Sequence, residues 1–151
     1  MFFEAFEVGQ VFESERRSLE EPAILDFAHR YDWQAFHTDV EAAAASPYGG
    51  IIASGYQTLL LAFGLTLEMG LWMDSGMGSP GMDRLRWILP VRPGDSLAVR
   101  VEVLALRPSR SKPDRGVVTF GHTVSRADGA VVMTYETMVI IARSGAGRPA
   151  G

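Results

Sequence analysis

The sequence of 151 residues contains no cysteine. Disulfide bonds, metal centres ligated by thiolates and a cysteine nucleophile are therefore excluded. Positive charge is also scarce, because 14 lysines and arginines are set against 18 aspartates and glutamates, and the net charge is −4. This balance argues against nucleic acid or an anionic membrane surface as the main partner.

The sequence lacks a hydrophobic run that is long and pure enough to predict a membrane span. The longest apolar stretch, residues 51–73, is interrupted by Gln57 and Glu68, whereas a span needs about 20 predominantly apolar residues. The N-terminal sequence MFFEAFEVGQ is acidic and lacks the basic start of a secretory signal peptide. Together with the absence of cysteine, these features predict a cytoplasmic protein.

Several motifs for metals and catalysis are also missing. The sequence has no H-x-x-x-H spacing and no G-x-S-x-G, which are typical of zinc sites and serine hydrolases. His37 and Asp39 are neighbours, but no second histidine joins them, and His29 and His122 are expected to be structural or exposed. The glycine-rich stretch 76–81 follows an expected helix instead of opening one, as a phosphate loop would. We therefore expect neither a metal nor a cofactor.

The composition that remains, 47% hydrophobic and 21% charged, is that of one globular domain. Residues 11–17 indicate a short strand. The sequence S-L-E-E at 18–21 matches a capping box, and with Pro22 in the first turn it predicts a helix. Its apolar face consists of residues three or four apart, namely Ile24, Phe27, Ala28 and Tyr31. Asp39 is expected to cap a further short helical turn that ends before Pro47.

The second half of the chain predicts one long helix and a sheet. The helix, at about residues 54–70, is apolar nearly all round, which is typical of a helix enclosed on most sides. Four strands are expected after it, with a tight hairpin at Asp128-Gly129, at residues 82–89, 96–106, 116–125 and 130–142. This order predicts an α+β protein in which a curved antiparallel β-sheet wraps around a long central helix, the hot dog fold. We expect the domain to span residues 1–143 and residues 144–151 to form a flexible tail.

The strongest functional signal lies in residues 31–55. Asp32 and His37 stand five residues apart, and Gly55 follows at the expected start of the long helix. A carboxylate, an imidazole and a helix N-terminus are the groups that acid/base chemistry beside a carbonyl requires. Asp32 alone could cap a turn and His37 alone could be structural, but their joint spacing favours chemistry.

Residues 31–58 resemble the MaoC-like dehydratases, a family that includes the (R)-specific enoyl-CoA hydratases. The family motif has an aspartate, a histidine five residues later and a glycine eighteen residues beyond it. Asp32, His37 and Gly55 match this motif, with GGIIASG leading into the helix. The later stretch DRLRWILPVRPGDSL is similar to the family's second signature, a strand followed by P-V-x-x-G-D. The resemblance extends over residues 8–143.

The sequence departs from the family pattern at three places. Family hydratases often carry Asn-Pro between the aspartate and the histidine, where this chain has Gln34-Ala35. Many have His-Gly at the position of Ser54-Gly55, and one type has a serine near the position of Phe63. These differences concern the positioning of water and the shape of the acyl pocket.

The resemblance implies a hydratase that reversibly adds water to a 2-enoyl thioester and gives a 3-hydroxyacyl thioester. Asp32 and His37 would share the catalytic water, and the amide of Gly55 would stabilise the enolate oxygen. The expected substrate-binding residues are Gln34, Ser54, Leu60 and Phe63. Coenzyme A or acyl carrier protein would carry the acyl group as substrate and not as a cofactor.

The resemblance also implies a homodimer or a larger oligomer built from dimers, with substrate bound between protomers. Two other functions stay open at this point. A hot dog thioesterase would use Asp32 to attack the thioester or to activate water at its carbonyl carbon. A non-catalytic acyl-binding module would need neither Asp32 nor His37.

Overall fold

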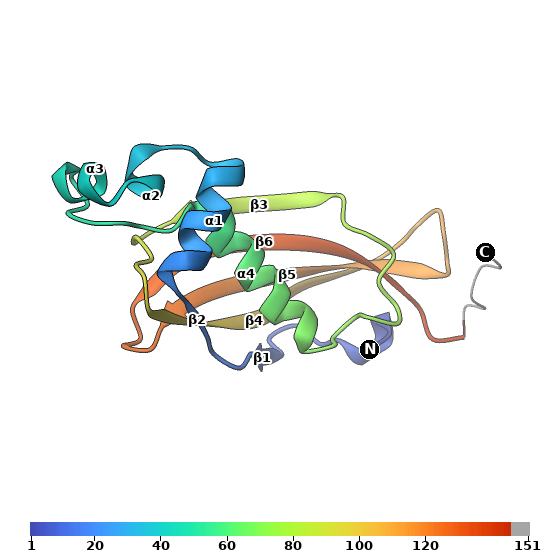
Figure 1. Cartoon of the computed structure of the whole chain (residues 1–151). Coiled ribbons are helices and arrows are strands. Elements are labelled where there is room, and N and C mark those ends of the chain that lie inside the picture. Colours follow the sequence, from blue (N-terminus) through green and yellow to red (C-terminus); the bar gives the residue numbers. More distant parts are fainter. Residues whose placement is uncertain (146–151) are drawn as a thin grey trace.

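The computed structural model describes residues 1–145 and consists of a curved antiparallel sheet with one long helix lying along one face (Figure 1). The strand order is β1-β4-β5-β6-β3. Strand β2 also pairs with β4, at residues 95–97, next to the part of β4 that pairs with β1. The predicted α+β hot dog fold is confirmed. Its strands are β1 Val11–Glu13, β2 Arg17–Leu19, β3 Gly81–Trp87, β4 Asp95–Pro108, β5 Arg115–Arg126 and β6 Val131–Ala142. Its helices are η1 Phe3–Ala5, α1 Glu21–Tyr31, α2 Ala35–Thr38, α3 Val40–Ala45 and α4 Gly55–Glu68.

The long strands follow the two-residue alternation that the sequence shows. On β4 the side chains of Val99, Val101 and Val103 are buried, and the residues between them are less buried or exposed. Successive side chains of a strand point to opposite faces, so this pattern places one face of the sheet in the core. The predicted hairpin between β5 and β6 is confirmed, since Gly129 has a φ of +86° and Asp128 accepts a hydrogen bond from the Ala130 amide.

The predicted capping box at residues 18–21 is wrong. Ser18 lies in β2 and pairs with Ser96 of β4, while α1 begins at Glu21 after an N-cap, Glu20, whose side chain makes no capping hydrogen bond. Pairing with a distant strand satisfies the backbone of residues 17–19, and this pairing overrides the local capping signal. Pro22 does lie in the first turn of α1, as expected.

Helix α4 is less enclosed than its apolar sequence predicts. The face toward the sheet buries Ala62 and Leu65 together with three polar residues, Gln57, Thr58 and Thr66. The opposite face leaves large apolar side chains exposed, with Tyr56 at 62%, Leu60 at 59% and Phe63 at 47%. One sheet can cover only one side of a helix, so the other side of α4 remains open in the single chain.

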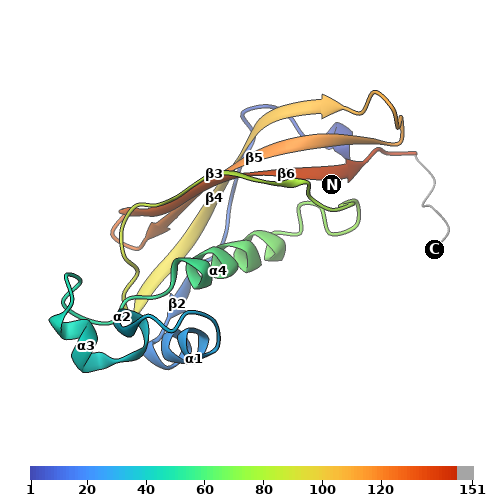
Figure 2. The same ribbon diagram turned by 90° about the horizontal axis from the view of Figure 1, so that it is seen from above.

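Helices α1, α2 and α3 gather beside the first turn of α4, at one end of the sheet (Figure 2). The predicted cap of α3 is confirmed, because Asp39 accepts a hydrogen bond from the Ala42 amide at 2.9 Å. Within residues 1–145 no helix combines the length and the hydropathy that crossing a membrane requires. Most of the predicted tail, residues 146–151, lies outside the described residues.

Candidate active site

Asp32 stands where α1 ends. Its backbone amide donates to the carbonyl of Ala28 at 2.9 Å and closes the last turn of the helix. The chain then turns, and the side-chain amide of Gln34 donates to Asp32 Oδ1 at 2.8 Å. The end of the helix and the hydrogen bond from Gln34 together fix the direction of the carboxylate.

His37 lies on the short helix α2 and is 4% exposed. Its Nδ1 is 2.7 Å from the carbonyl oxygen of Ile52. The ring of Phe36 packs edge-on against the imidazole ring, with the ring centroids 4.6 Å apart. A carbonyl can only accept a hydrogen bond, so Nδ1 carries the hydrogen and donates it. In the neutral imidazole, Nε2 therefore presents a lone pair.

The two side chains converge. His37 Nε2 lies 3.3 Å from Asp32 Oδ2, and the side chains are only 6% and 14% exposed, respectively. Burial by itself raises the pKa of Asp32, but the hydrogen bond from Gln34 and the proximity of the Ser54 hydroxyl and of His37 outweigh it. The pKa of this carboxyl is held below its ordinary value of 3.8. Asp32 is therefore ionised at neutral pH, and its carboxylate and the Nε2 of His37 face the same point.

The start of α4 completes the site. Ser54 is fully buried, and its side-chain oxygen accepts a hydrogen bond from the Tyr56 amide at 3.3 Å. Its hydroxyl lies close enough to the Asp32 carboxylate to help lower the pKa of that carboxyl. Gly55 is the first residue of α4, where backbone N–H groups have no partner within the helix. A Cβ at this position would lie 2.4 Å from the indole ring of Trp87, so only glycine fits beneath that ring.

A cavity of about 430 Å³ brings these groups together. Asp32, Gln34, His37 and Gly55 line it, and most of its remaining wall is apolar, formed by residues around α4, β3 and the segment after β3. This combination of an acid/base pair, a helix N-terminus and an apolar wall suits an acyl group with a reactive carbonyl. Among residues 1–145, no three histidines or carboxylates are grouped closely enough to hold a metal ion.

Comparison with known proteins assigns the chain to a family. Residues 4–126 match the model of the MaoC like domain. The chain belongs to the MaoC-like family. A solved structure, the MaoC-like dehydratase from Rhodospirillum rubrum, superposes with a TM-score of 0.89 at 38% identity and covers 99% of both chains.

Two further relatives of this MaoC-like protein differ in what is stated about them. The Bacillus subtilis (strain 168) protein YdeM, described as uncharacterized, is 34% identical over 143 residues, which are 95% of this chain and all of YdeM. The (R)-hydratase from A. caviae, described as involved in PHA biosynthesis, superposes with a TM-score of 0.72 at 26% identity. That match covers 89% of this chain and 96% of the A. caviae chain.

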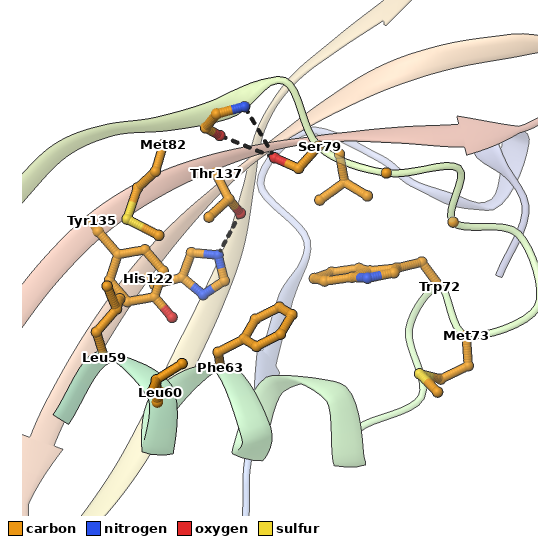
Figure 3. Close-up of a pocket in the computed structure, with 14 residues that line it drawn as sticks. Leu59, Leu60, Phe63, Trp72, Met73, Ser79, Met82, His122, Tyr135 and Thr137 are labelled. Carbon is orange, nitrogen blue, oxygen red and sulfur yellow. Dashed lines mark hydrogen bonds between the residues drawn. The ribbon is translucent and has the colours of Figure 1, made fainter. Parts of the chain in front are cut away.

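The structure brings together only part of the set that the sequence identified. One cavity is lined by Asp32, His37, Gln34 and Gly55. Ser54 is buried next to Gly55 and is not part of the cavity lining. Leu60 and Phe63 instead line a second cavity of about 580 Å³ (Figure 3), whose lining residues on α4 follow those of the first cavity.

Trp87 is the site residue that the sequence analysis did not single out. It lies in the second signature and packs on Gly55 and on the ring of Tyr56, with ring centroids 5.5 Å apart. The only signal in the sequence was its place within that signature, because tryptophan is common in strands. Its partner Gly55, however, is 32 positions away in the sequence, and only the fold shows that the two residues meet.

Proposed function

We propose that this MaoC-like protein catalyses the reversible addition of water to a 2-enoyl thioester, giving a 3-hydroxyacyl thioester. The observation that carries the proposal is the convergence of Asp32 and His37 beside the first turn of α4. Family membership supports hydratase or dehydratase chemistry in general, and the geometry supports this particular assignment of roles.

The protonation pattern of the pair favours a bound water. When the imidazole of His37 is neutral, its Nε2 and Asp32 Oδ2 are both acceptors, and they lie only 3.3 Å apart. Two facing acceptors repel each other unless a hydrogen lies between them or a donor bridges them. One water molecule can donate one hydrogen to each acceptor, and its oxygen lone pairs then point away from the pair, toward the substrate.

Hydration then proceeds on one face of the double bond. The water oxygen bonds to C3 of the enoyl group while one of its hydrogens passes to the Asp32–His37 pair. The electron pair of the double bond moves onto the thioester oxygen, and the Gly55 amide donates a hydrogen bond to the enolate that forms. A proton from the pair is delivered to C2, the carbonyl is restored, and the pair regains its starting charge.

The acyl group would leave the first cavity along α4, toward Leu60 and Phe63. Thr58 lines the first cavity and Leu59 the second, so the two cavities are adjacent on the helix. Coenzyme A or an acyl carrier protein would hold the thioester at the mouth of the first cavity. In this assignment Gln34 and Ser54 orient Asp32 and act on the substrate through it.

A second copy of the chain would cover the open face of α4. Tyr56, Leu60 and Phe63 lie at positions i, i+4 and i+7, so they form one apolar stripe. Trp87 packs against Tyr56 and continues this apolar surface onto the edge strand β3. A homodimer that pairs these surfaces would remove the stripe from water and enclose both cavities.

The test is a panel of 2-enoyl-CoA thioesters of different chain lengths. Loss of the conjugated enoyl absorbance without release of free thiol is expected. Thiol release would instead identify a thioesterase, and binding without either change would identify an acyl-binding module. Either of these results would overturn the hydratase assignment.

A further inference from the structure

The second cavity has an unusual wall. It measures about 580 Å³ and lies between α4, residues 72–82 and the inner faces of β5 and β6. Most of the lining is apolar, as Leu60, Phe63 and Trp72 illustrate, and it includes no lysine, arginine, aspartate or glutamate. A purely aliphatic acyl chain would need nothing more than such a surface.

Besides Ser79, whose hydroxyl is hydrogen-bonded to the backbone of Gly81, three polar side chains on the sheet line this cavity. His122 on β5 and Tyr135 on β6 are cross-strand partners, and their rings stack 4.2 Å apart at an angle of 3°. Thr137, two residues after Tyr135, is joined to His122 through a hydrogen bond of 2.9 Å between Oγ1 and Nε2. The strand pairing therefore fixes all three groups at one place on the wall.

Two polar atoms of this group have no partner among the described residues. They are His122 Nδ1 and the Tyr135 hydroxyl, on residues that are 3% and 2% exposed. The Thr66 hydroxyl is close enough to affect the pKa of Tyr135, but it donates to the Ala62 carbonyl at 2.9 Å, and its geometry toward Tyr135 falls short of a hydrogen bond. Buried polar atoms without partners destabilise a fold. Their presence therefore points to a bound group that completes them.

Both atoms are directed toward α4. Figure 3 shows one nitrogen of His122 bonded to Thr137 and the other facing the helix, and the Tyr135 hydroxyl also points to the helix near Leu60. Leu60 and Phe63 line the same cavity from the helix side. Both side chains are about half exposed in the single chain, and in the proposed dimer a ligand would reach the two atoms along α4 from the first cavity.

The chemistry of the wall favours an uncharged oxygen. Burial lowers the pKa of His122 to about 4, so this imidazole is neutral at neutral pH. No cation lines the cavity, and a carboxylate there would remain uncompensated. An alcohol oxygen both donates and accepts, so it can satisfy Tyr135 and His122 together, whichever tautomer the ring adopts.

We infer that the second cavity is a subsite for a neutral hydroxyl group on the acyl chain of the substrate, bound by the Tyr135 hydroxyl and by His122 Nδ1. The substrate class would then be oxygenated acyl thioesters whose polar group lies several carbons beyond the thioester. The inference takes the direction of the acyl chain from the proposed hydratase function.

The cavity can be tested without any turnover. The probes are 1-octanol and 1-fluorooctane, and binding is followed through the fluorescence of Trp72, with the Trp72→Phe variant as the control for the origin of the signal. A purely apolar cavity prefers the more hydrophobic fluoroalkane. We expect instead at least about 10-fold tighter binding of the alcohol, which corresponds to one hydrogen-bonding contact of about 1.4 kcal/mol.

Tyr135→Phe is the decisive variant, because it removes one oxygen and keeps the ring stack with His122. It should reduce the preference for the alcohol to about 3-fold or less. The melting temperature of the ligand-free protein should not fall, since the lost hydroxyl has no partner. His122→Phe should reduce the preference in the same way. Equal binding of the two probes, an undiminished preference in Tyr135→Phe, or a melting temperature lowered by several degrees would overturn the subsite.

A second measurement links the cavity to catalysis. Relative kcat/KM values for 8-hydroxyoct-2-enoyl-CoA and oct-2-enoyl-CoA should favour the hydroxylated substrate, and Tyr135→Phe should remove that preference. If neither thioester is hydrated, the hydratase proposal is overturned. The two octyl probes would still decide whether the cavity recognises an oxygen. Equal kcat/KM values would exclude the subsite as a determinant of specificity.

Discussion

The charge on Asp32 is the residue-scale feature on which the proposed chemistry depends most directly. Asp32→Asn keeps the size of the side chain but replaces one acceptor oxygen with a donor group. A water could then no longer donate to both members of the pair. We expect kcat/KM for enoyl-CoA hydration to fall by about 10²–10⁴ while the fold is retained.

A neighbouring aspartate supplies a matched control for this substitution. Asp39 caps α3 and lies outside the cavity of the pair. Because asparagine is an equally good helix cap, Asp39→Asn should leave both activity and stability nearly unchanged. Undiminished hydration by Asp32→Asn, with circular dichroism unchanged, would refute the role assigned to the carboxylate.

His122 is the second residue with a measurable consequence, and the quantity concerned is stability. Its pKa is about 4 in the folded protein and about 6.5 in the unfolded chain. Between these values the unfolded state binds more protons, so the free energy of unfolding is fully retained above pH 6.5 and falls as the pH drops toward 4. We expect a loss of about 2 kcal/mol between pH 7 and pH 5 in urea unfolding.

The variant His122→Phe isolates this contribution. Phenylalanine keeps a ring against Tyr135 but binds no proton, so the difference in unfolding free energy between pH 7 and pH 5 should shrink by about 2 kcal/mol. The pKa of Asp32 is lowered from 3.8, so its titration lies below this pH window and does not contribute. An unchanged difference in the variant would assign the acid sensitivity to other groups.

At the scale of the element, α4 contains two glycines with opposite surroundings. A Cβ on Gly55 would meet the Trp87 ring at 2.4 Å, whereas a Cβ on Gly64 would find nothing within 4 Å. Gly64→Ala should therefore raise the free energy of unfolding by about 0.5–1 kcal/mol, through helix propensity alone. Gly55→Ala should be about 1–3 kcal/mol less stable than Gly64→Ala, because the indole must be displaced.

Urea unfolding of the two alanine variants measures this difference, and near-ultraviolet circular dichroism reports the displacement of Trp87. Equal stability of the two variants would show that the indole moves aside without cost. Gly55→Ala should also lose hydration activity, because the same displacement disturbs the first turn of α4.

The element scale also shows what the sequence could and could not predict. Periodicity located α4 and the four long strands to within about two residues, because these signals are repeated along each element. The convergence of Asp32, His37 and Gly55 on one cavity was predictable for a related reason, since these residues lie within one short stretch. The capping box at Ser18 failed because pairing with β4, more than 70 positions away, determines the conformation there.

The second cavity was beyond prediction for the same physical reason. It is formed by α4, residues 72–82, β5 and β6, and no local pattern shows that His122 and Tyr135 will stack across two strands. The sequence analysis left His122 as structural or exposed. Its burial and its unpartnered nitrogen result from the register between β5 and β6.

At the scale of the whole molecule, the open face of α4 predicts self-association. We expect light scattering to give twice the chain mass of 16.5 kDa at micromolar concentration. Phe63→Glu places a charge in the centre of the apolar stripe and should shift the protein to the monomer mass. Val8→Glu, which changes a residue of similar exposure outside α4, should not. A wild-type monomer would contradict the proposed dimer.

The separation of the two cavities along the chain also bears on how such proteins diversify. Every group assigned to the chemistry lies between residues 32 and 55, whereas the inferred selectivity pair lies on β5 and β6, beyond residue 114. A single crossover between related genes, placed after α4, would therefore keep the reaction and exchange the preference for substrate. Descendants of one ancestral hydratase can in this way acquire new acyl specificities by inheriting a different second half.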